Sequence, residues 1–140
     1  MYKIKIASIG KMKESWLEEA FEEYVKRLRP SATIECVWFK NDEQLEQGIA
    51  EDTHVICLDP FGKEYDSVHF SGLLEESLLK GGSRLTFVIG GAEGLTADMR
   101  KKYPLISISK MTFTHQITRL ILIEQIYRAF SILKKTPYHK

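Results

Sequence analysis

The chain has 140 residues, 44% of them hydrophobic and 28% charged, and its formal net charge is +1 at pH 7. This length accommodates one globular domain with a sizeable core, so we expect residues 1–140 to form a single domain that carries the whole function. No stretch is apolar for long enough to span a membrane, and the first residues begin a strand pattern rather than a signal peptide. We therefore expect a cytoplasmic protein with no membrane partner.

The two cysteines indicate neither a metal centre nor a disulfide. Cys36 and Cys57 lie 21 positions apart, and neither belongs to a CxxC or CxxH pattern. Each falls within an apolar strand pattern, so we expect both to be small core residues.

Strand and helix patterns alternate along the chain. Strand patterns, rich in β-branched and aromatic residues, cover residues 3–9, 34–39, 54–58, 85–89 and 105–109. Helical patterns cover residues 16–28, 42–50, 67–80 after the cap residue Asp66, a brief segment after Thr96, and 115–134. This alternation predicts an α/β fold, an open and doubly wound parallel sheet with helices on both faces.

The last predicted helix, residues 115–134, is apolar nearly all round, so we expect it to be buried, in part against a second subunit. The same end of the chain is basic. Residues 106–140 contain six Lys or Arg and a single acidic residue, Glu124. Residues 31–70, in contrast, contain two Lys or Arg and nine Asp or Glu. A basic end suggests an anionic partner such as nucleic acid, and a solvated helix end is the alternative explanation.

A glycine-rich loop at residues 89–95 directly follows a strand pattern and matches neither the dinucleotide nor the P-loop spacing. Loops beyond the carboxyl ends of parallel strands bind ligands, so residues 58–62, 90–94 and 109–113 should form one pocket. Its lining would be backbone and apolar side chains, without an acid cluster for a metal or a catalytic triad. Such a pocket suits a cofactor that carries its own reactivity, and a purely structural turn is the alternative.

Asp59 and Lys110 match the acceptor and the lysine of a phospho-acceptor signalling module. That module needs an acidic pair after its first strand to hold a metal, and this chain has Ser8-Ile9-Gly10-Lys11 there. We therefore favour a turn role for Asp59 before Pro60.

The C-terminal region offers several side chains suited to RNA. Arg128 can pair with Glu124 at i,i+4 or contact phosphate. The tail, residues 137–140, combines an aromatic ring, an imidazole and a cation, which suits stacking on a base and contact with phosphate. His115, at the start of the last helix, is expected to cap that helix or to pack as a buried imidazole, and a functional role is the alternative.

Five segments together resemble the RlmH family, a group of small bacterial SPOUT-class methyltransferases. They are IKIASIGKMKE at 4–14, LDPFGKEYDS at 58–67, VIGGAEGL at 88–95, SISKMTFTHQITRLILIEQIYRAF at 107–130 and PYHK at 137–140. They occur in collinear order over nearly the whole chain.

The resemblance implies properties that periodicity does not indicate. It implies a trefoil knot near the C-terminus and a homodimer. The activity would be methylation of N3 of a pseudouridine in helix 69 of 23S ribosomal RNA, on the assembled ribosome and without a metal. S-adenosylmethionine would be bound by Leu58, Gly90, Ile108, Ser109, Lys110, Met111, Thr112 and Phe113.

The resemblance also suggests roles at the target base. We expect Tyr138 and His139 to lie there, with His139 the leading general base or hydrogen-bonding group, and Arg128 and Lys140 to contact the RNA. Arg128 joins Tyr138 and His139 as a candidate catalytic residue. The tail can serve its own pocket or the partner subunit's.

Two departures from the family pattern stand out. The connection over residues 40–53 is shorter than usual, so we expect a trimmed helix there, and Thr114 replaces the usual proline, where it can cap the last helix.

Two other functions remain open: methylation of a different RNA nucleotide, and cofactor binding without catalysis. The near-neutral charge makes naked RNA a poor partner, which a dimer or an assembled ribosome would offset.

Overall fold

Five parallel strands form one sheet in the order β2-β1-β4-β3-β5, in a computed structural model that describes residues 1–140. The elements are β1 (Tyr2–Ile9), α1 (Ser15–Leu28), β2 (Ala32–Phe39), α2 (Asp42–Ile49), β3 (Val55–Glu64), α3 (Ser67–Lys80), β4 (Arg84–Ile89), α4 (Ala97–Lys102), β5 (Leu105–Ser107) and α5 (His115–Lys134).

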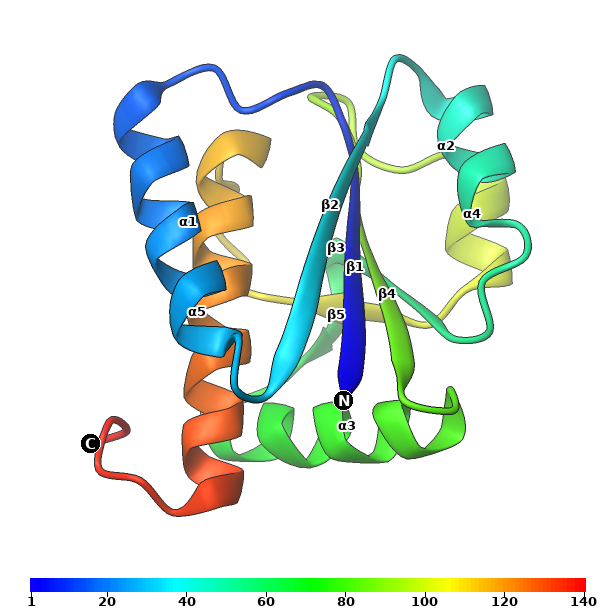
Figure 1. Cartoon of the computed structure of the whole chain (residues 1–140). Coiled ribbons are helices and arrows are strands. Elements are labelled where there is room, and N and C mark those ends of the chain that lie inside the picture. The colour runs from blue at the N-terminus through cyan, green and yellow to red at the C-terminus, as the bar shows by residue number, and fades with distance from the viewer.

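The helices cover both faces of the sheet. Helices α1, α3 and α5 lie on one face, and α2 and α4 lie on the other (Figure 1). Alternate strand residues supply the two cores, because successive side chains of a strand point to opposite faces. Ile6 and Phe87 belong to the larger core, whereas the next residues, Ala7 and Val88, belong to the smaller one. The predicted α/β fold with a parallel sheet and helices on both faces is confirmed.

Several helix starts follow directly from local chemistry. The side chains of Asp66, Thr96 and Thr114 each accept a hydrogen bond from a backbone N–H of the first turn that follows, as predicted for cap residues. Helix α2 keeps eight residues within the short 40–53 connection. No helix of the structure is both long and apolar enough to cross a membrane.

The predicted end of the third strand at residue 58 is wrong, because β3 continues to Glu64. Leu58 and Lys63 both pair with Ile106 of β5, so the residues between them form a bulge, which the turn-forming residues Pro60 and Gly62 permit. A Cβ on Gly62 would lie 2.6 Å from the backbone carbon of Leu105, so only glycine allows this close approach.

The expectation that both cysteines are core residues is half right. Cys57 is buried on β3, but Cys36 is exposed on β2, which is an edge strand with a neighbour on one side only.

Burial of α5 is confirmed for the face that packs against α1 and α3, with Leu122, Ile126 and Phe130 buried. The trefoil knot stays a prediction.

Candidate functional site

A cavity of about 650 Å³ lies at the carboxyl ends of β3, β4 and β5, within the size range of small-molecule sites. The loops after β4 and β5 bound it together with the first turn of α5 (Figure 1). Its lining comes from five places: residues 58–61 of β3, residues 89–94, Arg100 of α4, residues 107–109 and 111–114, and the α5 residues His115 and Thr118. The predicted pocket at the strand ends therefore exists, with the β3 bulge in place of the predicted first loop.

Seven of the eight residues expected at the cofactor line this cavity, namely Leu58, Gly90, Ile108, Ser109, Met111, Thr112 and Phe113. Lys110 does not line it. The Lys110 side chain is 86% exposed and its Nζ lies 3.8 Å from Glu64 Oε1, whereas the cation paired with Asp59 is Arg100. This arrangement also disfavours the phospho-acceptor alternative.

The glycine-rich loop folds back on itself at the cavity wall. Gly91 and Gly94 form a bridge, with the Gly94 N–H donating to Gly91 O at 2.9 Å, and Gly94 has a φ of +82°. A Cβ on Gly90 would lie 2.8 Å from Gly94 C, whereas a Cβ on Gly91 would only touch Ile9, at 3.5 Å. Gly90 is therefore required by the packing of the loop itself, which presents bare backbone to the cavity.

Asp59, which is buried, forms an ion pair with the partly exposed Arg100 at the cavity wall. Its Oδ1 accepts the Phe61 N–H at 2.9 Å, which confirms the predicted turn role. Its Oδ2 lies 2.8 Å from Arg100 Nε, and the Asp59 side chain is only 1% exposed. The pair joins the β3 bulge to α4, so two separate segments of the cavity wall are held together.

The first turns of α5 separate the cavity from the β1–α1 loop. His115 lines the cavity, and its pKa is lowered by desolvation and by the nearby charges of Arg119 and Lys13, so the ring is neutral at pH 7. Gln116 faces the other way and donates to Lys11 O at 2.7 Å. Arg119 is buried and donates to Ile9 O at 3.1 Å and to Gly10 O, which fixes the end of β1 beside the cavity.

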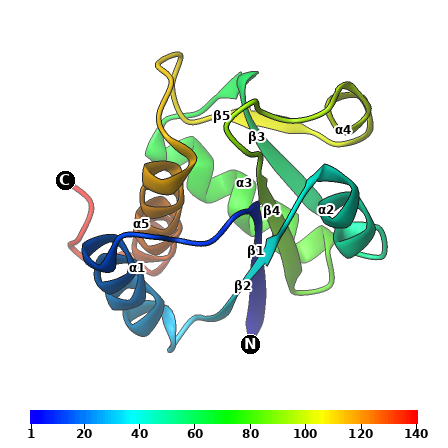
Figure 2. The same ribbon diagram turned by 90° about the horizontal axis from the view of Figure 1, so that it is seen from above.

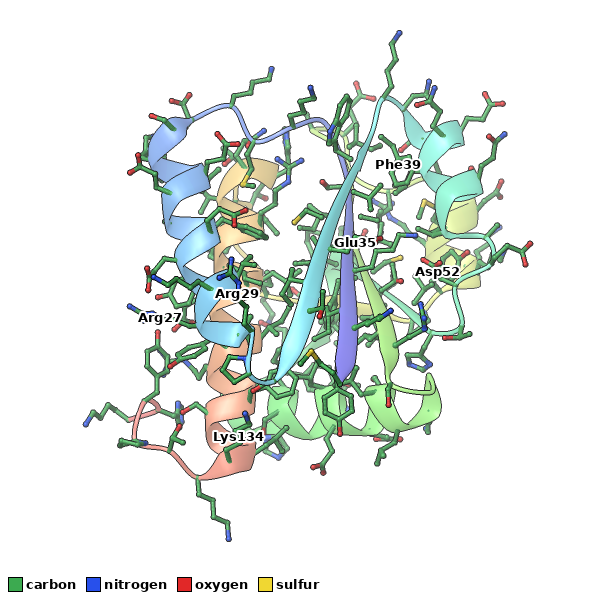
Figure 3. The ribbon with its side chains drawn as sticks, viewed as in Figure 1. Arg27, Arg29, Glu35, Phe39, Asp52 and Lys134 are labelled. Carbon is green, nitrogen blue, oxygen red and sulfur yellow. The ribbon has the colours of Figure 1, made fainter.

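The C-terminal tail folds onto the far end of α5. Lys135 adopts a left-handed conformation, with φ of 59°, which ends the helix and turns the chain back. The Tyr138 ring then packs edge-on against Tyr127, at 4.7 Å between centroids, and its hydroxyl donates to Glu124 Oε2 at 2.7 Å. Figure 3 shows Arg27 of α1 and Lys134 of α5 on the helix ends that border this tail.

Glu124 and Arg128 form the centre of the tail cluster. Arg128 Nη2 lies 2.8 Å from Glu124 Oε2, which confirms the predicted i,i+4 pair, and Arg128 Nη1 lies 3.1 Å from His139 Nδ1. The pKa of Tyr138 is raised by desolvation and by its hydrogen bonds with Tyr24 and Glu124, so it remains a protonated donor. Three predicted catalytic residues are thus in one place, whereas Lys140 is exposed beyond them.

The tail cluster does not meet the cavity within one chain. His115 and Arg128 are 13 residues apart on α5, which is about 20 Å along the helix axis at 1.5 Å per residue. The cluster lies at the opposite end of α5 from the strand-end loops (Figures 1 and 2).

Sequence reasoning did not assign four residues to these two sites. No local sequence pattern indicates Arg100, because its partner Asp59 lies 41 positions away in the chain. His115 and Thr118 are three residues apart at the start of a helix, a spacing that places both on one face and that could have been used. Glu124 was identified only as a partner of Arg128, and its bond to Tyr138 depends on the turn at Lys135.

Comparisons with known proteins agree with this geometry. A family model described as "Predicted SPOUT methyltransferase" matches residues 2–139. The chain is 54% identical over 140 residues to the Ribosomal RNA large subunit methyltransferase H of Protochlamydia amoebophila, with all of both chains covered. It is 40% identical over 160 residues to the protein of the same name from Desulfitobacterium hafniense, again with all of both chains covered.

Two solved structures share the fold at low sequence identity. One is a probable methylase family protein from Haemophilus influenzae Rd KW20, with a TM-score of 0.55, 11% identity, and coverage of 94% of this chain and 66% of that one. The other is TrmJ from Z. mobilis ZM4, with a TM-score of 0.55, 9% identity, and coverage of 91% and 69%. At these identities the likeness supports the fold alone.

Proposed function

This chain belongs to the RlmH family of SPOUT methyltransferases, and from that premise we propose that it transfers a methyl group from S-adenosylmethionine to N3 of a pseudouridine in helix 69 of 23S ribosomal RNA. The observation that carries the proposal is the strand-end cavity lined by the glycine loop and by residues 107–114.

The cavity fits a nucleoside-type cofactor. Leu58, Ile89 and Ile108 offer an apolar slot, and the bare backbone around Gly90 offers hydrogen-bonding groups at close range. When bound, the cofactor supplies an already activated methyl group on a positively charged sulfur. The residues of the chain therefore need only to bind it, exclude water and hold the acceptor in line. No group of three or more His, Cys, Asp or Glu is arranged to hold a metal, and the proposed chemistry requires none.

The proposed reaction balances without a further reactant. The N3 proton passes to water, the N3 lone pair forms the bond to the methyl carbon, and the electron pair of the breaking carbon–sulfur bond returns to sulfur. Because the positive charge on sulfur disappears, positioning contributes most of the catalysis.

A homodimer would unite the two sites of the chain. The tail cluster lies about 20 Å along α5 from its own cavity, so it can act only at a cavity on another subunit. Large apolar side chains are exposed at the cavity end of the molecule, where a partner would cover them: Trp16 is 55% exposed at the start of α1, Trp38 50% at the end of β2, and Ile117 40% at the start of α5. We therefore place the partner's tail at this chain's cavity.

The decisive assay uses ribosomes that lack the modification. Protein and labelled S-adenosylmethionine are incubated with these ribosomes, with free ribosomal RNA and with tRNA. The proposal predicts label in the large-subunit RNA of ribosomes, on N3 of the helix 69 pseudouridine. Label only in tRNA would support a different RNA target, and cofactor binding without label in any RNA would support a non-catalytic protein.

Deleting residues 137–140 separates the two halves of the site. We expect the truncated protein to retain S-adenosylmethionine binding, because no residue of 137–140 is among those that line the cavity, and to lose methyl transfer to ribosomes. Unchanged methyl transfer would contradict the role of the tail, including those of Tyr138, His139 and Lys140.

A further inference from the structure

The hydrogen bond between Arg128 and His139 determines which nitrogen of the imidazole carries the proton. The guanidinium of Arg128 has donors and no acceptor, and its Nη1 lies 3.1 Å from His139 Nδ1. Nδ1 must therefore accept, so it carries no hydrogen. A ring protonated on both nitrogens would place an N–H against an N–H, so the contact holds only the neutral ring with its hydrogen on Nε2.

Arg128 is itself held in place from the other side. Its Nη2 donates to Glu124 Oε2 at 2.8 Å and its Nε to Glu124 Oε1 at 3.5 Å, which leaves Nη1 directed at the imidazole. The Tyr138 ring lies 4.9 Å from the guanidinium carbon, and the Tyr138 hydroxyl donates to the same carboxylate. Glu124 thus anchors both neighbours of His139.

The Nε2–H of His139 has no hydrogen-bonding partner within the chain. Arg128 is the only group that bonds to the ring, and the tail is the part of the chain proposed to enter the partner's cavity. With Nδ1 occupied and Nε2 protonated, the ring has no free lone pair with which to take a proton from a substrate.

We propose that Arg128, anchored by Glu124, fixes His139 as the neutral imidazole protonated on Nε2, so that His139 acts on the target base as a hydrogen-bond donor and not as a general base. This inference rests on the proposed function. Loss of the N3 proton puts negative charge on the two carbonyl oxygens beside N3, and an N–H aimed at one of them stabilises that charge. The proton itself passes to water, as in the balanced reaction above.

The first test measures the tautomer without any activity. In protein labelled with ¹⁵N at histidine, the shifts of the two ring nitrogens report which one carries hydrogen. His69 is an internal control of the opposite kind, because its Nδ1 lies 2.7 Å from Asp66 Oδ1, a carboxylate oxygen that can only accept. We expect His139 to be protonated on Nε2 and His69 on Nδ1, with the His139 signals assigned by their absence from H139Q.

Two variants test the cause. R128A should shift the His139 ring-nitrogen signals toward those of an unrestrained imidazole, which exchanges between the two tautomers, whereas K134A, at the neighbouring helix end, should leave the His139 spectrum unchanged. A proton on Nδ1 of His139, or on both nitrogens at pH 7.5, would overturn the proposal. An unchanged His139 spectrum in R128A would also overturn it.

The second test compares two substitutions of His139 in methyl transfer to ribosomes. Gln can place an amide N–H where Nε2–H lies but cannot act as a base, and Ala provides neither. We expect H139A to lose about 100-fold to 1000-fold in kcat, the usual cost of one such donor, and H139Q to stay within about tenfold of the unsubstituted protein. Both variants should bind S-adenosylmethionine as the unsubstituted protein does.

Equal losses in H139Q and H139A, with cofactor and ribosome binding retained, would overturn the donor role. Absence of methylation by the unsubstituted protein would overturn the proposed function and the role of His139 together. The ring-nitrogen spectrum distinguishes that failure from a wrong tautomer, because it requires neither cofactor nor RNA.

Discussion

Two adjacent glycines in the cavity loop should respond differently to the same substitution. In Gly90→Ala the added Cβ would lie 2.8 Å from Gly94 C and 3.0 Å from Gly94 O, both backbone atoms that cannot rotate away. In Gly91→Ala the nearest atoms are side-chain carbons of Ile9 at 3.5 Å or more, an ordinary van der Waals contact. Gly91→Ala is therefore a matched control for Gly90→Ala.

The size of the effect follows from the overlap. Backbone shifts forced by one extra carbon in a packed region cost about 1–3 kcal/mol, so Gly90→Ala should lower the midpoint of thermal unfolding by about 5–10 °C. The Gly91–Gly94 turn must move to relieve the overlap, which misplaces backbone groups at the cavity wall. A loss of about 1.4 kcal/mol in cofactor binding corresponds to about a tenfold weaker affinity, and we expect at least that.

The assay combines thermal unfolding with calorimetric titration of S-adenosylmethionine for both variants and the unsubstituted protein. Gly91→Ala should unfold within about 0.5 kcal/mol of the unsubstituted protein and bind the cofactor nearly as well. Equal damage from the two substitutions would refute the reasoning, because the loop would then require both glycines for another reason. Unweakened cofactor binding by Gly90→Ala would refute the placement of the cofactor at this loop.

Three further predictions concern the walls of the cavity. Asp59→Ala should lower the free energy of unfolding, measured by urea titration, by about 2 kcal/mol or more, because it removes the ion pair with the partly exposed Arg100 and the hydrogen bond from the Phe61 N–H. Asp59→Asn keeps an oxygen that can accept the Phe61 N–H, so it should lower the free energy of unfolding by less. Thr114→Ala should cost about 1 kcal/mol through the lost cap of α5, while an unchanged value would show that the cap is dispensable. Folding lowers the pKa of His115 from its ordinary value of 6.5, so His115 does not affect the free energy of unfolding well above pH 6.5 and lowers it as the pH falls below 6.5. In urea titrations at several pH values, His115→Gln should remove part of this loss of stability at low pH. Identical pH profiles for the two proteins would contradict the lowered pKa of His115.

The order of elements was predictable because their signals are local. Asp66, Thr96 and Thr114 each cap a helix by accepting a hydrogen bond from the backbone N–H three residues later. The strand patterns likewise depend only on the residue types of neighbouring positions. The order of strands in the sheet depends on pairing between distant segments, about which periodicity says nothing. For the same reason the continuation of β3 was missed: Pro60 and Gly62 signal a turn, and only the approach of β5 makes it a bulge.

The cavity and the tail cluster differ in how far sequence could predict them. The glycine loop and the strand ends placed the cavity correctly, because carboxyl ends of parallel strands share one edge of a sheet. The ion pair of Asp59 with Arg100 joins residues of different elements and had no local signal. The bond between Arg128 and His139 depends on the left-handed turn at Lys135, an uncommon conformation for a lysine.

A heterodimer experiment tests most directly the central claim that one subunit's cavity works with the other subunit's tail. Gly90→Ala and a chain lacking residues 137–140 are co-expressed with different tags, and the mixed dimer is isolated. It contains one intact cavity facing one intact tail, so we predict about half the methyl transfer of the unsubstituted dimer on ribosomes, while each parent homodimer is strongly impaired. A mixed dimer as impaired as its parents, or a fully active homodimer of the shortened chain, would contradict the claim.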